Sequence, residues 1–317
     1  MKNINVCILG AGGQLGSSLL NRLIKNENFK IFAIDKIFIN KLENNNLEYI
    51  QVDVKKDISE AFLNIPNDTV FINCIGIQHA LLSKKIMSIN YRLNKKIFDY
   101  INIHYSNFKF IHISSLSVDY KNQDLISPGS GNAINLYGVS KLKFEEYLSH
   151  NRTDGKFITI IRPAAFYDLK LSANLENFFD LLVNKFFILP STNIQRSFLS
   201  LSYFSKFLEE FILRKEIIDI FEIADEDPIE FNSLLLYLKD SQVEVKSKII
   251  YLPKFLFRVA GYAGYYLEKI GIHLAILTIL GEFGYDYIAN VSHPKYSIHK
   301  ENTYTSFRDI IKLTNSK

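Results

Sequence analysis

Glycines cluster directly after the first apolar run of the chain, and this cluster constrains the fold more than any other feature. Gly10-Ala11-Gly12-Gly13-Gln14-Leu15-Gly16 follows residues 4–9, which have the continuous hydrophobicity of a buried strand, and it opens a stretch with helical spacing. Glycines at such a turn let the backbone approach a pyrophosphate at a helix N-terminus. The loop therefore predicts dinucleotide binding through Gly10, Gly13, Gln14, Leu15 and Gly16, although a strand-to-helix turn also favours glycine for structural reasons alone.

The first half of the chain alternates short apolar runs with helix-like stretches, as a doubly wound parallel sheet does. Strands are predicted at 4–9, 30–34, 49–52, 70–73, 108–113 and 157–161, with helices at 15–24 and 90–101. After Pro163 the pattern loosens into a helix at 200–213 and a late strand at 220–224. We therefore expect an α/β protein. A Rossmann-type domain would span 1–163 and be rejoined by 197–224, and a smaller C-terminal substrate-binding lobe would contain 164–196 and 225–317.

Composition excludes several classes of protein. Hydrophobic residues make up 48% and charged residues 22% of 317 residues, which is typical of a globular chain with a sizeable core. The net charge of +4 is small and spread along the chain, so we expect no nucleic-acid partner. Cys7 and Cys74 each lie in an apolar run, which predicts no disulfide framework and favours the reducing cytoplasm. No grouping has the spacing of metal ligands, so no metal is expected.

We expect neither a signal peptide nor a membrane-spanning helix. The N-terminus lacks the basic start, apolar stretch and cleavage site of a signal peptide. The most hydrophobic region, residues 252–280, is interrupted by Lys254, Arg258, Glu268 and Lys269, so no membrane span is expected there. We predict that this region forms packed helices of the C-terminal lobe, with a membrane-surface element as the alternative.

Acidic residues end the second and third predicted strands. Asp35 stands about 20 residues beyond the glycine loop, where a carboxylate accepts the ribose hydroxyls of a dinucleotide and repels a 2′-phosphate. This position favours NAD as the cofactor, while the neighbouring Lys36 keeps NADP open. Asp53 and Val54 close the third strand and are expected at the adenine edge of the cofactor. A solvated carboxylate at a strand end is the alternative for each aspartate.

Tyr137 and Lys141 are four residues apart, a spacing that places both on one face of a helix. A nearby ammonium would lower the pKa of the Tyr137 phenol and make it a base near neutral pH. The spacing is also common on surface helices. However, Ser114 and Ser115 end a predicted strand at the carboxyl edge of the sheet, where α/β proteins bind ligands. A serine there can hydrogen-bond the substrate oxygen whose proton Tyr137 removes.

With these motifs the chain resembles the extended short-chain dehydrogenase/reductase superfamily, in particular its NAD-dependent nucleotide-sugar epimerases and dehydratases. Its GxxGxxG loop, its YxxxK pair and its catalytic serine correspond to Gly10, Gly13 and Gly16, to Tyr137 and Lys141, and to Ser115. The resemblance implies that Ser115, Tyr137 and Lys141 are catalytic, and that the last two also touch the cofactor. It implies further cofactor contacts from Cys74, Ile75, Gly76, Asn90 and Pro163.

Three positions are implied on the substrate side. Gln78 would meet the sugar phosphate, Asn174 the nucleotide base, and Arg196 the diphosphate, for which a planar fork of donors is suited. Loop polarity or a surface ion pair is the alternative for each of them.

The function implied is that of an NAD-dependent nucleotide-diphosphate-sugar 4-epimerase, with a UDP-linked substrate, a transient 4-keto sugar and Tyr137 as the base. One alternative is an NAD(P)H-dependent 4-keto sugar-nucleotide reductase or dehydrogenase. Another is a noncatalytic dinucleotide-binding scaffold or assembly factor, which the joint presence of Ser115, Tyr137 and Lys141 disfavours. Dehydration is not expected, because Leu116 stands where dehydratases carry an acid and leucine cannot transfer a proton. A homodimer is left open.

Overall fold

The computed structural model describes residues 3–78, 83–118, 135–151, 157–168, 185–213, 220–272, 274–289, 298–299 and 303–315. The chain divides into two compact units. Unit 1 comprises Met1–Ser114, Ser140–Arg162 and Leu201–Phe221. Unit 2 comprises Ser115–Val139, Pro163–Ser200 and Glu222–Lys317.

A parallel sheet forms the centre of unit 1, and it confirms the predicted Rossmann-type fold class. Its strands are β1 (Ile4–Leu9), β2 (Phe29–Asp35), β3 (Leu47–Gln51), β4 (Thr69–Asn73), β5 (Phe108–Ile113) and β6 (Phe157–Pro163). The order across the sheet is β3-β2-β1-β4-β5-β6, continued by β11 (Ile220–Asp225), which begins in unit 1. Strands β2 and β3 thus lie on one side of β1, and strands β4 to β6 lie on its other side, so the strand order reverses at β1. The carboxyl ends of β1 and β4, where Leu9 pairs with Asn73, flank this switch point.

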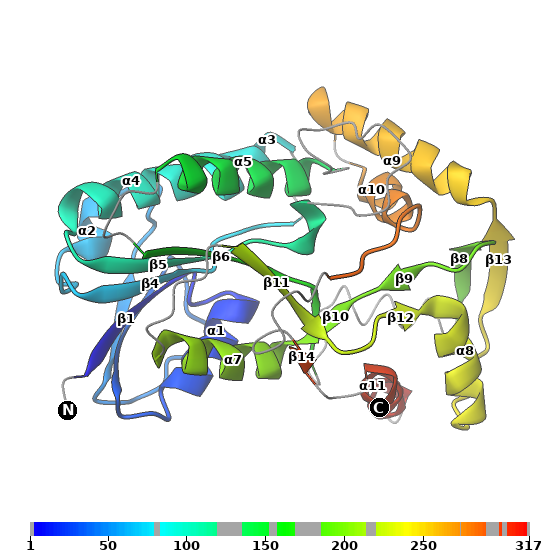
Figure 1. Cartoon of the computed structure of the whole chain (residues 1–317), viewed down its shortest axis with the longest axis horizontal. Coiled ribbons are helices and arrows are strands. Elements are labelled where there is room, and N and C mark those ends of the chain that lie inside the picture. The colour runs from blue at the N-terminus through cyan, green and yellow to red at the C-terminus, as the bar shows by residue number, and fades with distance from the viewer. Residues whose placement is uncertain are drawn as a thin grey trace. The chain divides into compact units, whose positions relative to one another are not determined.

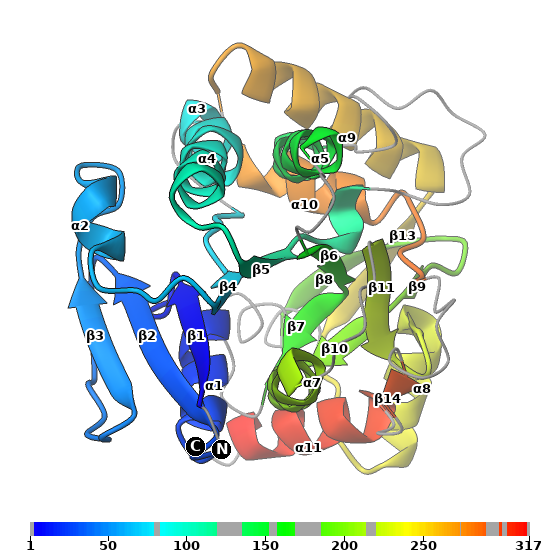
Figure 2. The same cartoon turned by 60° about the vertical axis from the view of Figure 1, so that its left-hand side comes forward.

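Helices cover both faces of the sheet, which explains why its strands are continuously hydrophobic. The helical segments of unit 1 are α1 (Gln14–Leu23), α2 (Ile58–Phe62), α3 (Ser83–Met87), a π-helical turn (Ser88–Leu93), α4 (Asn94–His104), α5 (Leu136–His150) and α7 (Leu201–Leu213). Figure 2 shows α3, α4 and α5 on one face, with α1 and α7 on the other. An Arg22–Glu209 ion pair of 2.5 Å links α1 to α7. The first four residues of α5 belong to unit 2.

Unit 2 is built from short strands, a 3-10 turn at Leu116–Val118 and the helices given below (Figure 1). Its strand pairs are β7 (Ala165–Tyr167) with β10 (Phe198–Ser200), β9 (Gln195–Arg196) with β12 (Ile229–Glu230), and β8 (Phe186–Pro190) with β13 (Lys248–Leu252). The end of β11 pairs with β14 (Ile298–His299). The described helices are α8 (Phe231–Asp240), α9 (Lys254–Lys269), α10 (Ala275–Glu282) and α11 (Thr303–Asn315).

One buried carboxylate joins distant segments of unit 2. Asp225 is 2% exposed and accepts hydrogen bonds from the Tyr167 hydroxyl at 2.6 Å, the Ser200 N–H at 3.2 Å and the Thr303 hydroxyl at 3.2 Å. Each donor comes from a different element, namely β7, β10 and α11. Asp225 therefore holds β7, β10 and α11 to the end of β11.

Glycines allow α9 and α10 to pack closely as a helical hairpin. A Cβ at Gly281 would lie 2.3 Å from the Gly261 Cα, so a side chain at this position would push the two helices apart. The hairpin confirms the predicted packed helices in the hydrophobic region 252–280. No helix among the described residues is long and apolar enough to cross a membrane.

Candidate active site

The glycine loop connects β1 to α1 with little space around its backbone. Gly10 has a φ of +81°, a conformation that favours glycine, and Gly13 caps the N-terminus of α1. A Cβ at Gly12 would lie 2.2 Å from the carbonyl oxygen of Ile37, and a Cβ at Gly16 would lie 2.2 Å from the carbonyl oxygen of Gly10. Both positions therefore require glycine. Gly12 was not among the predicted site residues, although it stands in the same run of glycines.

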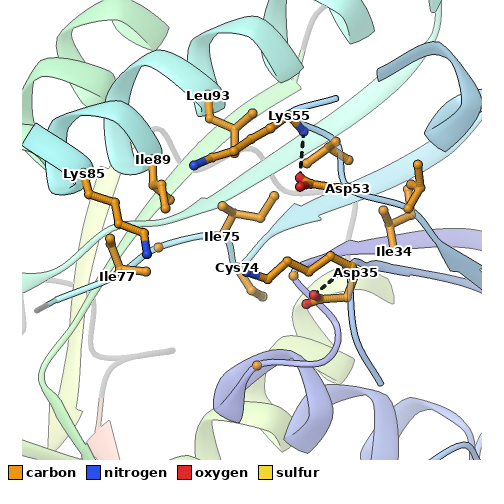
Figure 3. A pocket seen from close by; sticks show the side chains of 16 residues that line it. Ile34, Asp35, Asp53, Lys55, Cys74, Ile75, Ile77, Lys85, Ile89 and Leu93 are labelled. Atoms are coloured by element: carbon orange, nitrogen blue, oxygen red, sulfur yellow. Dashed lines mark hydrogen bonds between the residues drawn. The ribbon is translucent and has the colours of Figure 1, made fainter. Parts of the chain in front are cut away.

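A cavity of about 370 Å³ opens beside this loop at the carboxyl ends of β1 to β4 in unit 1. Nine predicted cofactor residues line it: Gly10, Gly13, Asp35, Lys36, Asp53, Val54, Cys74, Ile75 and Gly76. The remaining lining residues were not predicted: Ile34, Val52, Lys55, Ile77, Lys85, Ile89 and Leu93. In Figure 3, Asp35 and Asp53 lie at one end of the cavity and Lys85 at the other. The size is that of a small-molecule site.

Asp35 is held in place by backbone donors. Its Oδ2 accepts the Gly12 N–H at 3.0 Å, and its Oδ1 accepts the N–H groups of Lys36 at 2.7 Å and Ile37 at 3.3 Å. An ionised carboxylate offers about four acceptor positions, so Asp35 keeps capacity for further donors from the cavity. The contacts orient Asp35 as an acceptor at the end of β2.

Asn90 lies behind the cavity wall. It is fully buried; its Oδ1 accepts the Ile77 N–H at 2.8 Å, while its Nδ2 donates to the Ile77 carbonyl at 2.9 Å and to the Ser140 hydroxyl at 3.0 Å. These bonds tie the segment after β4 to α5. In this structure Asn90 therefore shapes the wall that Cys74, Ile75 and Gly76 present.

Lys141 reaches the same wall from α5. A Cβ at Gly76 would lie 3.0 Å from the Lys141 Nζ, and this Nζ donates to the Ile113 carbonyl at 2.9 Å. Burial lowers the pKa of Lys141 to about 8, against smaller raising effects of Cys74 and Glu145. The ammonium of Lys141 is thus buried beside the cavity wall, where it can contact a ligand bound in unit 1.

Tyr137 stands in the first turn of α5, one turn before Lys141, and belongs to unit 2. Its phenol shares a hydrogen bond with the Ser115 hydroxyl. Burial raises the pKa of Tyr137; the Ser115 bond lowers it, and the Glu282 carboxylate raises it again. The predicted lowering of this pKa is therefore wrong for the chain alone, because burial outweighs the favourable contacts. The phenol is neutral near pH 7.

Two carboxylates from the helical hairpin hold the start of α5. Glu268 is 3% exposed, and its Oε2 accepts the Leu136 N–H at 3.0 Å. The side-chain amide of Asn135 donates to Glu282 at 3.4 Å and its oxygen accepts the Gly138 N–H at 2.8 Å. Neither glutamate was predicted. They lie more than 130 residues beyond Tyr137 in the chain, and no local pattern marks them.

Arg196 is packed between aromatic rings in unit 2. Its guanidinium lies 4.7 Å from the Phe283 ring centre and 5.0 Å from that of Tyr287, and its Nη1 is 3.5 Å from the Glu282 Oε2. Burial lowers the pKa of Arg196, although Glu282 counteracts this. Its Nε and Nη2 are buried and have no hydrogen-bond partner among the described residues. These two donors are available to an anion.

The remaining predicted site residues lie at separate places in the structure. Gln78 is exposed at the end of the segment after β4, and Pro163 is buried at the end of β6. Gln14, Leu15 and Gly16 form the first turn of α1, whose N–H groups have no acceptor within the helix. Asn174 lies outside the described residues. The structure thus brings Ser115 to Tyr137, and Lys141 to Gly76.

A parallel sheet with a glycine loop at its switch point and an acidic residue ending the second strand defines the class of dinucleotide-dependent α/β enzymes. The chain belongs to the NAD dependent epimerase/dehydratase family, whose sequence profile matches residues 6–181. The family confirms the predicted NAD-dependent enzyme, and with it the predicted kind of cofactor. Among curated protein sequences, no relative of the chain is detected.

Solved structures of low identity share the fold. The UDP-N-acetylglucosamine 4-epimerase of Methanobrevibacter ruminantium M1, in complex with UDP-N-acetylmuramic acid, is 16% identical with a TM-score of 0.69, covering 100% of this chain and 99% of that one. The UDP-glucuronic acid 4-epimerase of Bacillus cereus, with UDP-glucuronic acid and NAD, is 18% identical with a TM-score of 0.65, covering 98% and 99%. Pal from Bacillus thuringiensis is 15% identical with a TM-score of 0.71, covering 99% and 100%.

Proposed function

We propose that the chain is an NAD-dependent nucleotide-diphosphate-sugar 4-epimerase that works through a transient 4-keto sugar. The observation that carries this proposal is the hydrogen-bonded pair of Ser115 and Tyr137, followed one helical turn later by Lys141. A hydroxyl, a phenol and an ammonium in this order suit removal of a proton from a sugar hydroxyl. Membership of the epimerase/dehydratase family supports the same chemistry.

The cavity of unit 1 fits NAD. Gly12 and Gly16 leave no room for a side chain, so the backbone itself forms the cradle at the N-terminus of α1. Asp35 lies where a ribose with free hydroxyls would donate to it, and its charge disfavours a 2′-phosphate. Asp53 and Val54 would contact the adenine. When bound, NAD would supply the acceptor and then the donor of a hydride.

The residues of the chain would divide the proton chemistry between them. Tyr137 would take the proton of the C4 hydroxyl and return it to the same oxygen after the hydrogen on C4 has been replaced from the opposite face of the ring, so no net oxidation results. Ser115 would hydrogen-bond the reacting oxygen and keep it beside the phenol. Lys141, dry and cationic below pH 8, would stabilise the phenolate and the ribose. Its positive charge would oppose the effect of burial on the pKa of Tyr137.

Arg196 supports a diphosphate-containing substrate. Its buried Nε and Nη2 donors point to an anion, and a planar guanidinium fork matches phosphate oxygens. The solved epimerases of similar fold were obtained with UDP-linked sugars, which favours UDP as the carrier here. Gln78 and Asn174 remain predicted contacts of the sugar phosphate and the base.

The same residues also suit an alternative function. The phenol of Tyr137 is hydrogen-bonded to the Ser115 hydroxyl, and a neutral phenol is a proton donor. Protonation of a ketone oxygen is what a 4-keto sugar-nucleotide reductase requires. The same three residues would then act in the opposite direction, with NADH or NADPH consumed.

Product analysis distinguishes the two functions. The chain would be incubated with UDP-glucose, UDP-galactose and their N-acetyl forms without added nicotinamide, and products separated by chromatography. Interconversion with no lasting change in NADH absorbance is expected. Stoichiometric oxidation of NADH by 4-keto-6-deoxy sugar nucleotides, with no interconversion of the other sugars, would instead establish the reductase.

A further inference from the structure

Three fully buried asparagines surround the segment that follows β4 in unit 1. Asn73 ends β4, Asn90 lies in the π-helical turn, and Asn94 begins α4; each is 0% exposed. Only Asn90 was among the predicted site residues. Asparagine is mostly found on protein surfaces, and a buried amide requires hydrogen-bond partners for its oxygen and its nitrogen. The partners of these three side chains therefore indicate what the group does.

The asparagine side chains bind the backbone of Ile75 and Ile77 in the way that a neighbouring strand would. Asn73 Oδ1 accepts the Ile75 N–H at 3.1 Å, and Asn94 Nδ2 donates to the Ile75 carbonyl at 3.1 Å. Asn90 makes the corresponding two bonds with Ile77, through its Oδ1 and its Nδ2. Both backbone groups of two alternate residues are thus bound by side chains, beyond the point where β4 ends.

The orientation of each amide in this network is fixed by its partners. A backbone N–H only donates, so Asn73 must offer its oxygen to Ile75 and direct its Nδ2 elsewhere. This Nδ2 lies 3.2 Å from Asn94 Oδ1 and 3.3 Å from His112 Nδ1, and it donates to both. Asn94 Nδ2 in turn donates to the Ile75 carbonyl and, at 3.0 Å, to the Asn90 carbonyl. Asn94 therefore uses its oxygen and both of its N–H groups, a set of bonds that no other side chain of its size can make.

Gly76 presents the opposite edge of this segment. In an extended chain the backbone groups of successive residues point to opposite sides, so those of Gly76 point away from the side on which Ile75 and Ile77 are bound. Neither backbone group of Gly76 has a hydrogen-bond partner among the residues that the structure describes, and Gly76 lines the cavity of unit 1. The asparagine network thus leaves a backbone donor and a backbone acceptor for a ligand in that cavity.

The network also reaches helix α5. Asn90 Nδ2 donates to the hydroxyl of Ser140, which is 0% exposed and directly precedes Lys141. Asn94 is bonded to the Asn90 carbonyl, so the cavity wall and α5 are held by one set of buried hydrogen bonds. Buried polar networks of this kind rigidify the structure around them. The position of the wall relative to the Lys141 ammonium is therefore set by the network.

We propose that Asn94 is a positioning residue of the cofactor site, which holds residues 74–77 so that the backbone of Gly76 is presented to NAD. Asn94 acts through the wall, because it is fully buried and is not among the residues that line the cavity. A surface that is already ordered binds more tightly, since its groups need not be ordered on binding. The π-helical turn directly before Asn94 supports this role, because such turns occur frequently at functional sites. NAD is the cofactor of the family, so the proposal holds whether the sugar is epimerised or reduced.

Alanine variants of two buried asparagines in unit 1 test the proposal. Asn94→Ala removes the bonds to the wall, whereas Asn5→Ala removes a hydrogen bond of 3.0 Å to Asp68 at the start of β1. Asn5 is 9% exposed, so both variants should unfold at a lower urea concentration than the unmodified chain. In calorimetric titration Asn94→Ala should bind NAD at least about tenfold more weakly, and Asn5→Ala should stay within about twofold of the unmodified chain.

Asn94→Ser keeps the test decisive if the alanine variant does not fold. A serine hydroxyl can donate to the carbonyl four residues earlier in a helix, here that of Asn90, but it is too short to reach the Ile75 carbonyl. This variant should be more stable than Asn94→Ala and should still bind NAD at least about fivefold more weakly than the unmodified chain.

Hydrogen exchange followed by mass spectrometry locates the change. Peptides that cover residues 74–77 should exchange faster in the folded Asn94 variants, while peptides of β1 and β5 should keep the rates of the unmodified chain. Four results would overturn the proposal: no NAD binding by the unmodified chain, NAD affinity within about twofold of the unmodified chain in a folded Asn94 variant, an equal loss of affinity in Asn5→Ala, or exchange that accelerates evenly across the sheet.

Discussion

The backbone N–H of Gly12 donates to the Oδ2 of Asp35 at 3.0 Å, so the glycine loop and the carboxylate at the end of β2 form one hydrogen-bonded unit. A ligand that approaches the loop therefore meets the charge of Asp35 in a fixed position. Two consequences follow for the choice of cofactor and for the tolerance of the loop.

Replacing Asp35 with alanine should narrow the preference for NAD over NADP. The variant loses the acceptor for the ribose hydroxyls and the charge that repels a 2′-phosphate, so NAD affinity should fall about 10- to 100-fold, as expected for hydrogen bonds to a charged group. Calorimetric titration with both cofactors measures the change. Equal affinity of the unmodified chain for NAD and NADP would contradict the assigned role.

The loop glycines offer a matched pair of alanine variants. At Gly16 a Cβ would lie 2.2 Å from the Gly10 carbonyl oxygen, whereas at Gly13 the nearest atom is 3.3 Å away. Gly16→Ala should abolish NAD binding and lower the melting temperature, because only backbone movement relieves the clash. Gly13→Ala should keep the fold and lose less affinity. Similar NAD affinities for the two variants would show that the loop adapts.

Tyr137→Phe removes one hydroxyl and keeps the ring. Turnover should fall by about 10² to 10⁴, the usual contribution of acid–base catalysis, while NAD binding is kept. Tyr147→Phe, on the same helix, is the control and should leave turnover within about threefold. Undiminished activity of the Tyr137 variant would assign the base to another residue.

Lys141→Met should separate stability from catalysis. Burial lowers the pKa of Lys141 from 10.5 to about 8, so its protonation destabilises the folded chain, and this cost is fully present below pH 8. At pH 7 the variant should gain stability, by up to about 3 kcal/mol, while losing turnover. The gain should shrink as the pH rises from 8 to 10.5. Urea unfolding of both proteins across this pH range measures the gain in the free energy of unfolding. A gain that is smaller at pH 7 than at pH 10 would show that burial does not lower the pKa of Lys141.

Glu268 is expected to position the first turn of α5. Glu268→Ala leaves the partly buried Leu136 N–H without its acceptor, which should lower the free energy of unfolding by about 1–3 kcal/mol. It should also reduce kcat more than it raises KM, because Tyr137 is carried by that turn. Glu268→Gln keeps an oxygen acceptor and should recover most of both losses. If alanine and glutamine variants have the same kcat, Glu268 has no positioning role.

Local sequence patterns were sufficient for much of the fold. Residues 4–9 and 108–113 are apolar throughout because helices cover both faces of the sheet, and both match the observed strands. The placement of Asp35 at a strand end also followed from spacing alone. These features depend on neighbours in the chain, which a sequence displays directly.

The active-site surroundings could not be predicted in the same way. Glu268 and Glu282 contact the start of α5 only after the chain has folded back over more than a hundred residues. The pKa of Tyr137 depends on the burial that this folding creates, so the spacing to Lys141 suggested the wrong direction. Long-range packing decides both, and the sequence pattern carries no signal for it.

The Asp225 junction sets an order for events on the ribosome. Two of its donors, Tyr167 and Ser200, precede it in the chain, whereas Thr303 lies 78 residues beyond it, so the junction is incomplete until the last helix has emerged. Unit 1 needs nothing beyond Phe221 and can fold earlier. In a nascent chain stalled before Thr303, the nucleotide-binding sheet of unit 1 would thus be folded while unit 2 is still incomplete. Chaperones would then bind unit 2.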